Sequence, residues 1–133
     1  AQAADFIMDK PKGFKERIVE GAGNLSGGQK QRLSIARALV RKPDIYIYDD
    51  SFSALDMKTD AVLRQALKPE VKNAIVIIVA QRVSTIMDAD QILVLDEGRL
   101  AASGRHEELL KTCPLYYEIA ASQLSEEELQ NVC

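Results

Sequence analysis

Two adjacent carboxylates, Asp49 and Asp50, are the residues best suited to chemistry in this sequence. They follow the short β-prone run Ile45–Tyr48, so we expect them at the end of a strand, where parallel α/β sheets place their ligands. Two carboxylates this close repel each other, and a divalent cation offsets that repulsion. The pair therefore predicts a metal-assisted site, and the alternative is a solvated strand end without a ligand.

A second stretch suited to chemistry is Ser26-Gly27-Gly28-Gln29. Ser26 and Gln29 have the spacing of a capping box, which predicts a helix that begins after Ser26 and runs toward Arg41. The two glycines carry no side chains, so an anion can approach their N–H groups, and the helix dipole favours negative charge at this end. The stretch therefore predicts a phosphate contact, and an ordinary capped surface helix is the other interpretation.

A P-loop is not found in the sequence. That loop needs Gly, four residues, and then Gly-Lys followed by Ser or Thr. From Gly23 the spacing reaches Gly28, but Gln29 and Lys30 occupy the positions that require Lys and Ser or Thr. These residues therefore lack the phosphate-binding loop of a self-sufficient nucleotidase.

The helix after Ser26 should end before Pro43, because proline cannot continue the hydrogen-bond ladder. Apolar residues recur along this helix at three- and four-residue spacing. The buried stripe that this spacing predicts consists of Leu33, Ala36, Leu39 and Val40.

The expected strands are Ile45–Tyr48 and Ala74–Ala80, and the second is apolar without alternation, as in a strand buried on both faces. Between them Met57–Leu67 has helical spacing, and Asp56 is placed to act as its N-cap. Because a strand, a helix and a strand follow one another, the two strands should pair in parallel. The fold class is therefore α/β.

The C-terminal part predicts a hairpin over residues 91–103, with its turn at Asp96-Glu97-Gly98. Two helical segments are expected, one over residues 106–111 and the other over residues 114–122 with 125–130, where Ser125 and Glu128 form a capping box. His106 has no second His or nearby Cys at ligand spacing, so a structural role is favoured over metal binding.

Composition favours one soluble globular domain, because 47% of the 133 residues are hydrophobic and 28% are charged. The net charge of −3 argues against a broad nucleic-acid-binding face.

The longest apolar run, Ala74–Ala80, is too short to cross a bilayer, and no signal peptide is predicted. The distant cysteines Cys113 and Cys133 do not make a disulfide framework, so a reducing cytoplasmic setting is expected. The first residue is not Met and Ala1–Ile7 reads as the middle of a helix, so we expect a fragment.

Leu25–Gln29 reads LSGGQ and is followed without a gap by KQRLSIARALVRKPDIYIYDD. These residues resemble the signature motif and Walker B strand of ATP-binding-cassette (ABC) ATPases. The resemblance continues through SALD at Ser53–Asp56, VAQR at Val79–Arg82, and DADQILVLDEGRLAASGRHEELL at Asp88–Leu110. It implies the C-terminal part of a P-loop NTPase domain of the ABC type, with a parallel-sheet core, part of the helical subdomain, and no Walker A half. Residues 1–42 would belong to the helical subdomain and residues 43–133 to the ATPase core.

The resemblance also implies roles for the site residues, with ATP and Mg²⁺ as ligands. Asp49 would hold Mg²⁺ through water, and Asp50 stands where hydrolysing members usually have Glu. Gln81 stands at the position of the family's switch histidine, and glutamine cannot relay a proton near neutral pH. Both departures predict a site that hydrolyses ATP poorly.

Ser26, Gly27, Gly28 and Gln29 match the family's signature, which contacts ATP held mainly by a second ATPase subunit. The chain therefore resembles the degenerate half of a heterodimeric ABC exporter, which completes its partner's competent site. Such an ATPase works with a transmembrane domain at the cytoplasmic face of the cell membrane, and no nucleic acid is expected as a partner.

For two segments, two interpretations of the function are both open. Asp56 ends a stretch that crosses the dimer interface in the family, so a role in coupling the two ATP sites and a purely helix-capping role are both open. Glu16–Ala22 occupies the place of a coupling loop in exporters, and a solvated loop is the other interpretation.

Two other functions are considered. A soluble ABC ATPase that acts on nucleic acid or ribosomes would share the signature, but the exporter-like run Asp88–Leu110 and the negative net charge weigh against it. A non-catalytic interaction module would lend a signature helix to a partner. Without a P-loop, the 133 residues alone should bind little ATP.

Overall fold

The helix α2 (Gly27–Val40), which carries the signature stretch, begins where the sequence predicts. The computed structural model describes residues 1–126 and 129, and Ser26 is the N-cap of α2. Ser26 Oγ accepts the Gln29 N–H at 3.2 Å and Gln29 Oε1 accepts the Ser26 N–H at 3.0 Å, so the predicted capping box is confirmed. The helix is capped at its other end by Arg41, and Lys42 then adopts a left-handed φ of 46°, a common way for a helix to stop.

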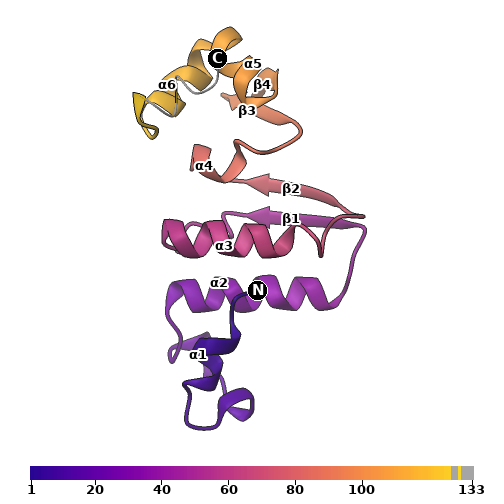
Figure 1. Cartoon of the computed structure of the whole chain (residues 1–133), viewed down its shortest axis with the longest axis vertical. Coiled ribbons are helices and arrows are strands. Elements are labelled where there is room, and N and C mark those ends of the chain that lie inside the picture. The colour runs from indigo at the N-terminus through magenta and orange to yellow at the C-terminus, as the bar shows by residue number, and fades with distance from the viewer. Residues whose placement is uncertain (127–128, 130–133) are drawn as a thin grey trace. The chain divides into compact units, whose positions relative to one another are not determined.

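The chain divides into two compact units, Ala1–Val79 and Ala80–Cys133. The elements of the first unit are α1 (Ala4–Met8), the 3₁₀ turns η1 (Gly13–Lys15) and η2 (Glu20–Ala22), α2, β1 (Ile45–Asp49), α3 (Met57–Leu67) and β2 (Ile75–Val79) (Figure 1). Of the helices in the described part of the chain, none has the length and apolar content to cross a membrane.

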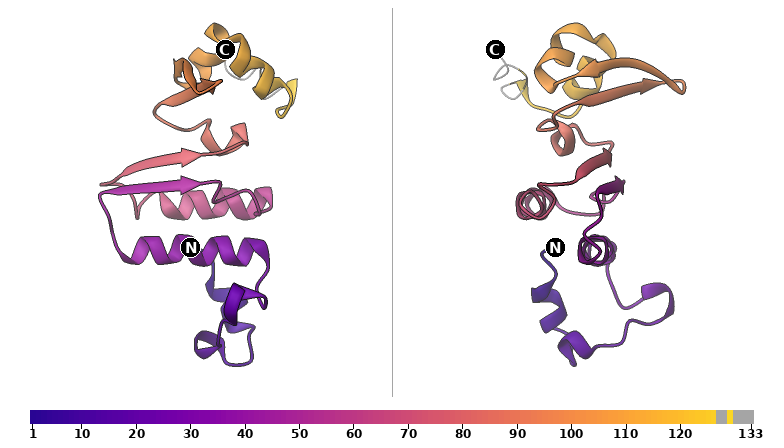
Figure 2. Two further views of the ribbon diagram at one scale, coloured as in Figure 1. Left: turned by 180° about the vertical axis from the view of Figure 1, so that it is seen from behind. Right: turned by 90° about the vertical axis from the view of Figure 1, so that its right-hand side faces the viewer.

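The strands β1 and β2 pair in parallel, with Ile45 opposite Ile75 and Asp49 opposite Val79, so the predicted pairing is confirmed. The helix that connects them, α3, has Asp56 as its N-cap, as predicted. Figure 2 shows α2 and α3 as neighbouring helices within this unit. The first unit is therefore an α/β arrangement in which two helices accompany a parallel strand pair.

The core of the first unit lies where one face of β1 meets the two helices. Tyr46 and Tyr48 point into this core and are each 4% exposed, whereas Ile45 and Ile47 alternate outward and are 51% and 67% exposed. The buried residues of the core are Ile35, Tyr46, Tyr48, Phe52, Leu55, Leu63 and Leu67.

The predicted buried stripe on α2 is wrong in large part, because Leu33 and Ala36 are only half-buried and Leu39 alone of its four residues packs against the core. Val40 is 84% exposed, and the buried residue of the helix is Ile35, beside which Ala38 and Leu39 pack against the core. Apolar residues lie on more than one side of α2, so their spacing alone does not select the side that faces the core.

The prediction that the second strand is buried on both faces is also wrong. In β2 the side chains of Ile75, Ile77 and Val79 are exposed, and only Ile78 packs against the core. Continuous apolar runs are typical of parallel strands with a layer on each side. Among the described residues of this unit, no second layer covers β2.

The second unit is built on a hairpin and short helices. Its elements are α4 (Val83–Ile86), β3 (Ile92–Asp96), β4 (Arg99–Gly104), α5 (His106–Thr112) and α6 (Pro114–Ala121). β3 and β4 pair antiparallel, and the turn residues Glu97 and Gly98 have φ of 45° and 76°, as a type I′ hairpin turn requires. The predicted hairpin and its turn are confirmed.

A buried His106 and Tyr116 pair lies in the second unit. His106 Nδ1 and the Tyr116 hydroxyl are 2.8 Å apart, and their rings meet edge to face. Burial lowers the pKa of His106 and raises the pKa of Tyr116 to about 12. Both side chains are therefore neutral at pH 7, and they link the start of α5 to α6.

Some predictions for the end of the chain concern residues that the structure does not describe. The capping box proposed for Ser125 includes Glu128, which lies outside the described residues, and so do Gln130 and Cys133.

Candidate functional site

The predicted carboxylate pair lies at the end of β1, as the sequence indicates. Asp49 is the last residue of the strand and Asp50 follows it, and both are exposed. Asp50 has a left-handed φ of 49°, which costs a non-glycine residue on the order of 1 kcal/mol, although Asp tolerates it better than most. Its N–H donates to the Val79 carbonyl oxygen at 3.0 Å, and its own carbonyl accepts from Ser53 Oγ at 3.0 Å. These bonds hold the backbone of Asp50 in its unusual conformation.

The loop after β1 contacts the start of α2 directly. A methyl carbon added to Gly28 would lie 3.0 Å from the Ala54 carbonyl oxygen and 3.2 Å from Leu55 Cδ2, closer than carbon atoms normally approach. A methyl carbon on Gly27 would lie 3.4 Å from Ala54 Cβ, an ordinary contact. Close packing within the chain therefore favours glycine at position 28, a reason that differs from the predicted approach of an anion.

Gln31 joins the same helix to the same loop, and sequence reasoning missed it. Its Nε2 donates to the Asp50 carbonyl oxygen and to Ser53 Oγ, each at 3.1 Å, and its Oε1 accepts the Ala54 N–H at 3.0 Å. Gln31 lies three residues after Gly28, so the two share a helix face. That spacing is the one sequence feature that points to Gln31.

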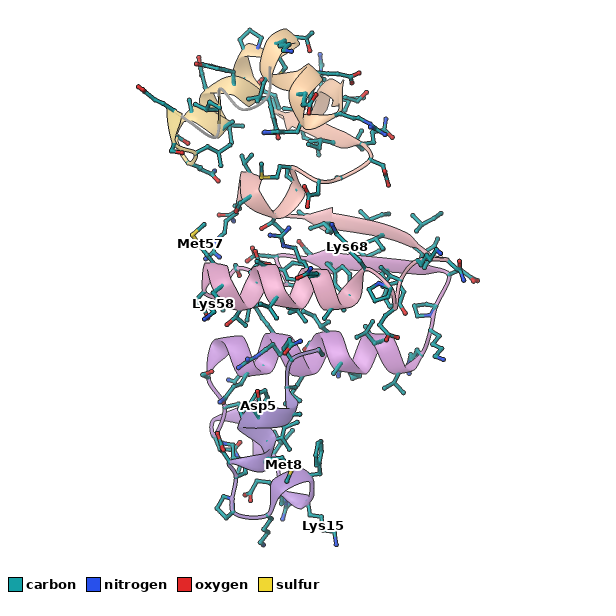
Figure 3. The ribbon with its side chains drawn as sticks, viewed as in Figure 1. Asp5, Met8, Lys15, Met57, Lys58 and Lys68 are labelled. Carbon is teal, nitrogen blue, oxygen red and sulfur yellow. The ribbon has the colours of Figure 1, made fainter. Side chains whose placement is uncertain are left out.

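Asp56 is engaged in capping. Its Oδ1 accepts the Thr59 N–H at 2.9 Å, and its Oδ2 accepts the Thr59 hydroxyl at 2.6 Å. The hydrogen bonds from Thr59 lower the pKa of the exposed Asp56 carboxyl. Met57 and Lys58 follow as the first residues of α3 (Figure 3). Capping is therefore confirmed, whereas the coupling role of Asp56 stays a prediction.

Gln81 belongs to the second unit and follows the end of β2 by two residues in the sequence. Its backbone carbonyl accepts from Gln123 Nε2 at 2.9 Å, and Gln123 Oε1 accepts the Val83 N–H at 2.9 Å. The side chain of Gln123 thus holds the backbone on both sides of Arg82, at the start of α4. The residue Gln81 is exposed.

The segment Glu16–Ala22 is held in a defined shape next to the start of α2. Asn24 Nδ2 donates to the Arg17 carbonyl at 3.1 Å, and Lys30 Nζ donates to the Gly21 carbonyl at 3.2 Å. Gly21 has a φ of 69°, which glycine adopts without strain. Farther out, Met8 is 63% exposed and Lys15 ends η1 (Figure 3).

The donor set suits a hydrated cation better than a closed metal site. Within residues 1–126 and 129, no group of three His, Cys, Asp or Glu side chains is arranged to hold a metal. Mg²⁺ keeps several waters and is commonly bound through one or two carboxylates together with the phosphates of a substrate. The exposed carboxylate of Asp49, at a strand end beside Asp50, fits that mode.

Comparison with protein families and curated sequences gives consistent matches. A family model described as "ABC transporter" matches residues 2–53. An uncharacterized ABC transporter ATP-binding protein of Mycobacterium tuberculosis is 50% identical over 121 residues, which are 91% of this chain and 21% of that protein. The human ATP-binding cassette sub-family B member 5 is 46% identical over 123 residues, which are 92% of this chain and 10% of that protein. The chain thus spans about a fifth or less of the length of these relatives.

Among solved structures, a bacterial Atm1-family ABC exporter with ATP bound matches with a TM-score of 0.87 and 44% sequence identity. The match covers 92% of this chain and 22% of that chain. It confirms the predicted α/β fold as part of an ABC-type P-loop NTPase domain.

Proposed function

This chain belongs to the ABC transporter family as part of its ATP-binding domain, and we propose that it helps to power the export of a substrate by ATP hydrolysis. The observation that carries the proposal is the contact between the LSGGQ end of α2 and the loop that follows the strand-end carboxylates. The helix tip and the strand-end carboxylates, which we assign to two different ATP sites, thereby lie in one unit. The similarity to an exporter with ATP bound supports the same activity.

The tip of α2 is proposed to contact ATP that is held mainly by a second ATPase subunit. Ser26 and Gly27 are exposed there, and four N–H groups at a helix start have no intrahelical acceptor. Together with the helix dipole they favour a phosphate. Gln29, whose Oε1 is engaged in the capping box, keeps this end rigid and leaves its Nε2 as a donor.

Asp49 and Asp50 are proposed to serve this chain's own ATP site. Asp49 would hold Mg²⁺ through water, and the ion would neutralise charge on the phosphates. Asp50 would act on the attacking water, but its carboxylate is shorter than that of Glu by about 1.5 Å, and misplacement by about 1 Å costs on the order of 100-fold in rate.

Gln81 would face the terminal phosphate of the same ATP, where glutamine donates a hydrogen bond but does not relay a proton near neutral pH. With Asp50 this makes the chain's own site a poor hydrolase. We therefore propose a heterodimer in which the partner subunit carries the competent hydrolytic residues and this chain completes that site. Asp56 would couple the two sites, since its loop connects the carboxylates to α3.

The proposed transporter also includes a transmembrane domain, with the ATPase at the cytoplasmic face of the membrane. Residues 1–42 would form part of the helical subdomain and residues 43–133 part of the ATPase core. The ordered segment Glu16–Ala22 would contact the coupling region of the transmembrane domain. Exposed apolar side chains support such a contact, namely Ile18 and Val19 within this segment and Met8 and Phe14 before it in the sequence.

Paired substitutions in the complete transporter test the proposal. Ser26→Asp keeps a strong helix cap but places a negative charge next to the phosphate, so ATP turnover should fall by about 100-fold while stability is retained. Asp50→Asn also tolerates the left-handed backbone and should change turnover by less than about twofold, because the partner's site performs the hydrolysis. Equal losses in both variants would contradict the asymmetric arrangement.

For the 133 residues alone, a non-catalytic role is the second candidate, and the lack of a P-loop pattern in the sequence favours it. Titration of the isolated chain with ATP and Mg²⁺ should then show no saturable binding below about 1 mM, the Kd that corresponds to about 4 kcal/mol of binding free energy. Micromolar binding would show that these residues hold nucleotide without a partner.

A further inference from the structure

The side-chain amide of Gln31 is fully committed to one loop. Its Nε2 donates to the Asp50 carbonyl and to Ser53 Oγ, and its Oε1 accepts the Ala54 N–H, all at 3.0–3.1 Å. A glutamine amide has two N–H donors and one carbonyl acceptor, so both donors and the acceptor are used here. Each bond joins α2 to residues that lie 19 to 23 positions later in the sequence.

We propose that Gln31 is a positioning residue that fixes the Asp50–Ala54 loop to α2 and so relates the carboxylate of Asp50 to the helix tip at Ser26. The inference rests on the proposed function, in which the tip serves the partner's ATP and Asp50 serves this chain's own. Gln31 then connects the two ATP sites within a single chain.

One of the local hydrogen bonds of the loop is long. The Ser53 N–H reaches the Asp50 carbonyl at 3.4 Å, close to the limit for a hydrogen bond, and the Ser53 hydroxyl adds a second local contact. Asp50 also carries the strain of a left-handed φ. The bonds from Gln31 join the loop to a different element through a side chain.

The close packing at Gly28 supports the same role. Because Gly28 lets the Ala54 backbone approach α2, the amide of Gln31, one helical turn later, can reach the loop without water between them. A displacement of the helix tip when ATP binds in the partner's site is thereby passed to the backbone of Asp50 through direct contacts.

Hydrogen exchange and ATP turnover of the complete transporter test the proposal. Gln31→Leu removes all three bonds, whereas Gln31→Glu retains the acceptor for the Ala54 N–H and removes both donors. Arg37→Ala, an exposed change on the same helix, is the control. In Gln31→Leu, exchange over residues 50–56 should rise at least about tenfold, as expected for the loss of about one net hydrogen bond. Turnover at saturating ATP should fall by about tenfold with KM nearly unchanged, because the loosened loop no longer supports the helix tip that completes the partner's site.

In Gln31→Glu, the Ala54 amide should stay protected while turnover falls by an intermediate factor. Wild-type exchange over residues 50–56 in Gln31→Leu would overturn the inference. So would increased exchange with turnover equal to that of Arg37→Ala, because Gln31 would then be structural only. Absence of ATP turnover in the wild-type complex would instead refute the proposed function, so the two failures are distinguishable.

Discussion

Substitution of Gly28 by alanine tests the close approach between α2 and the loop after β1. The added methyl carbon would lie 3.0 Å from the Ala54 carbonyl oxygen, so the loop must move by several tenths of an ångström or the helix must shift. Overpacking of this kind costs about 1–3 kcal/mol, and the higher helix propensity of alanine returns at most about 1 kcal/mol. We expect Gly28→Ala to lower the free energy of unfolding by about 1–2 kcal/mol.

Gly27→Ala is the matched control, because its methyl carbon would make an ordinary 3.4 Å contact with Ala54 Cβ. Its free energy of unfolding should stay equal or rise by about 0.5 kcal/mol, since alanine restricts the unfolded chain. Urea denaturation followed by circular dichroism measures both variants. Equal stability of the two alanine variants would refute the packing argument, and the role of Gly28 would return to phosphate binding alone.

Three further predictions concern buried polar groups. Tyr48→Phe should leave stability unchanged or raise it by about 1 kcal/mol in thermal unfolding, because the Tyr48 hydroxyl is buried without a hydrogen-bond partner in the part of the chain that the structure describes. Arg64→Ala should destabilise by about 2–3 kcal/mol, because it leaves the buried Asp60 carboxylate unpaired, and adding Asp60→Asn should recover part of the loss in a double-mutant cycle. Burial lowers the pKa of His106. Below about pH 6.5 the unfolded chain therefore binds a proton that the folded chain does not, so the free energy of unfolding should fall as the pH is lowered. His106→Gln should flatten that pH dependence between pH 6.5 and 5, and an unchanged slope would assign it to other groups.

Local signals in the sequence predicted local structure well. Ser26 and Gln29 specify a capping box through hydrogen bonds within one turn, and Asp56 specifies the start of α3 in the same way. The Glu97-Gly98 turn and the parallel pairing of β1 and β2 followed from turn chemistry and element order. These features depend on few residues, so a single sequence suffices to predict them.

Features that depend on contacts between elements were not predicted. The choice of Ile35 over Val40 as the buried residue of α2 depends on which side of the helix meets β1. The bonds of Gln31 depend on a loop that lies 19 to 23 residues later, and the left-handed φ of Asp50 depends on its contacts with Val79 and Ser53. The roles of Asp49, Asp50 and Gln81 in ATP hydrolysis remain predictions, because they concern ligands and a second subunit.

The outward face of the parallel strand pair has a practical consequence. Ile45, Ile47, Ile75 and Ile77 are all exposed, and they lie in register on two hydrogen-bonded strands. A β-branched surface of this kind promotes sheet stacking between molecules. The 133 residues produced alone should therefore self-associate as their concentration rises, and polar replacements at Ile47 and Ile77 should improve solubility without touching the tyrosines on the other side.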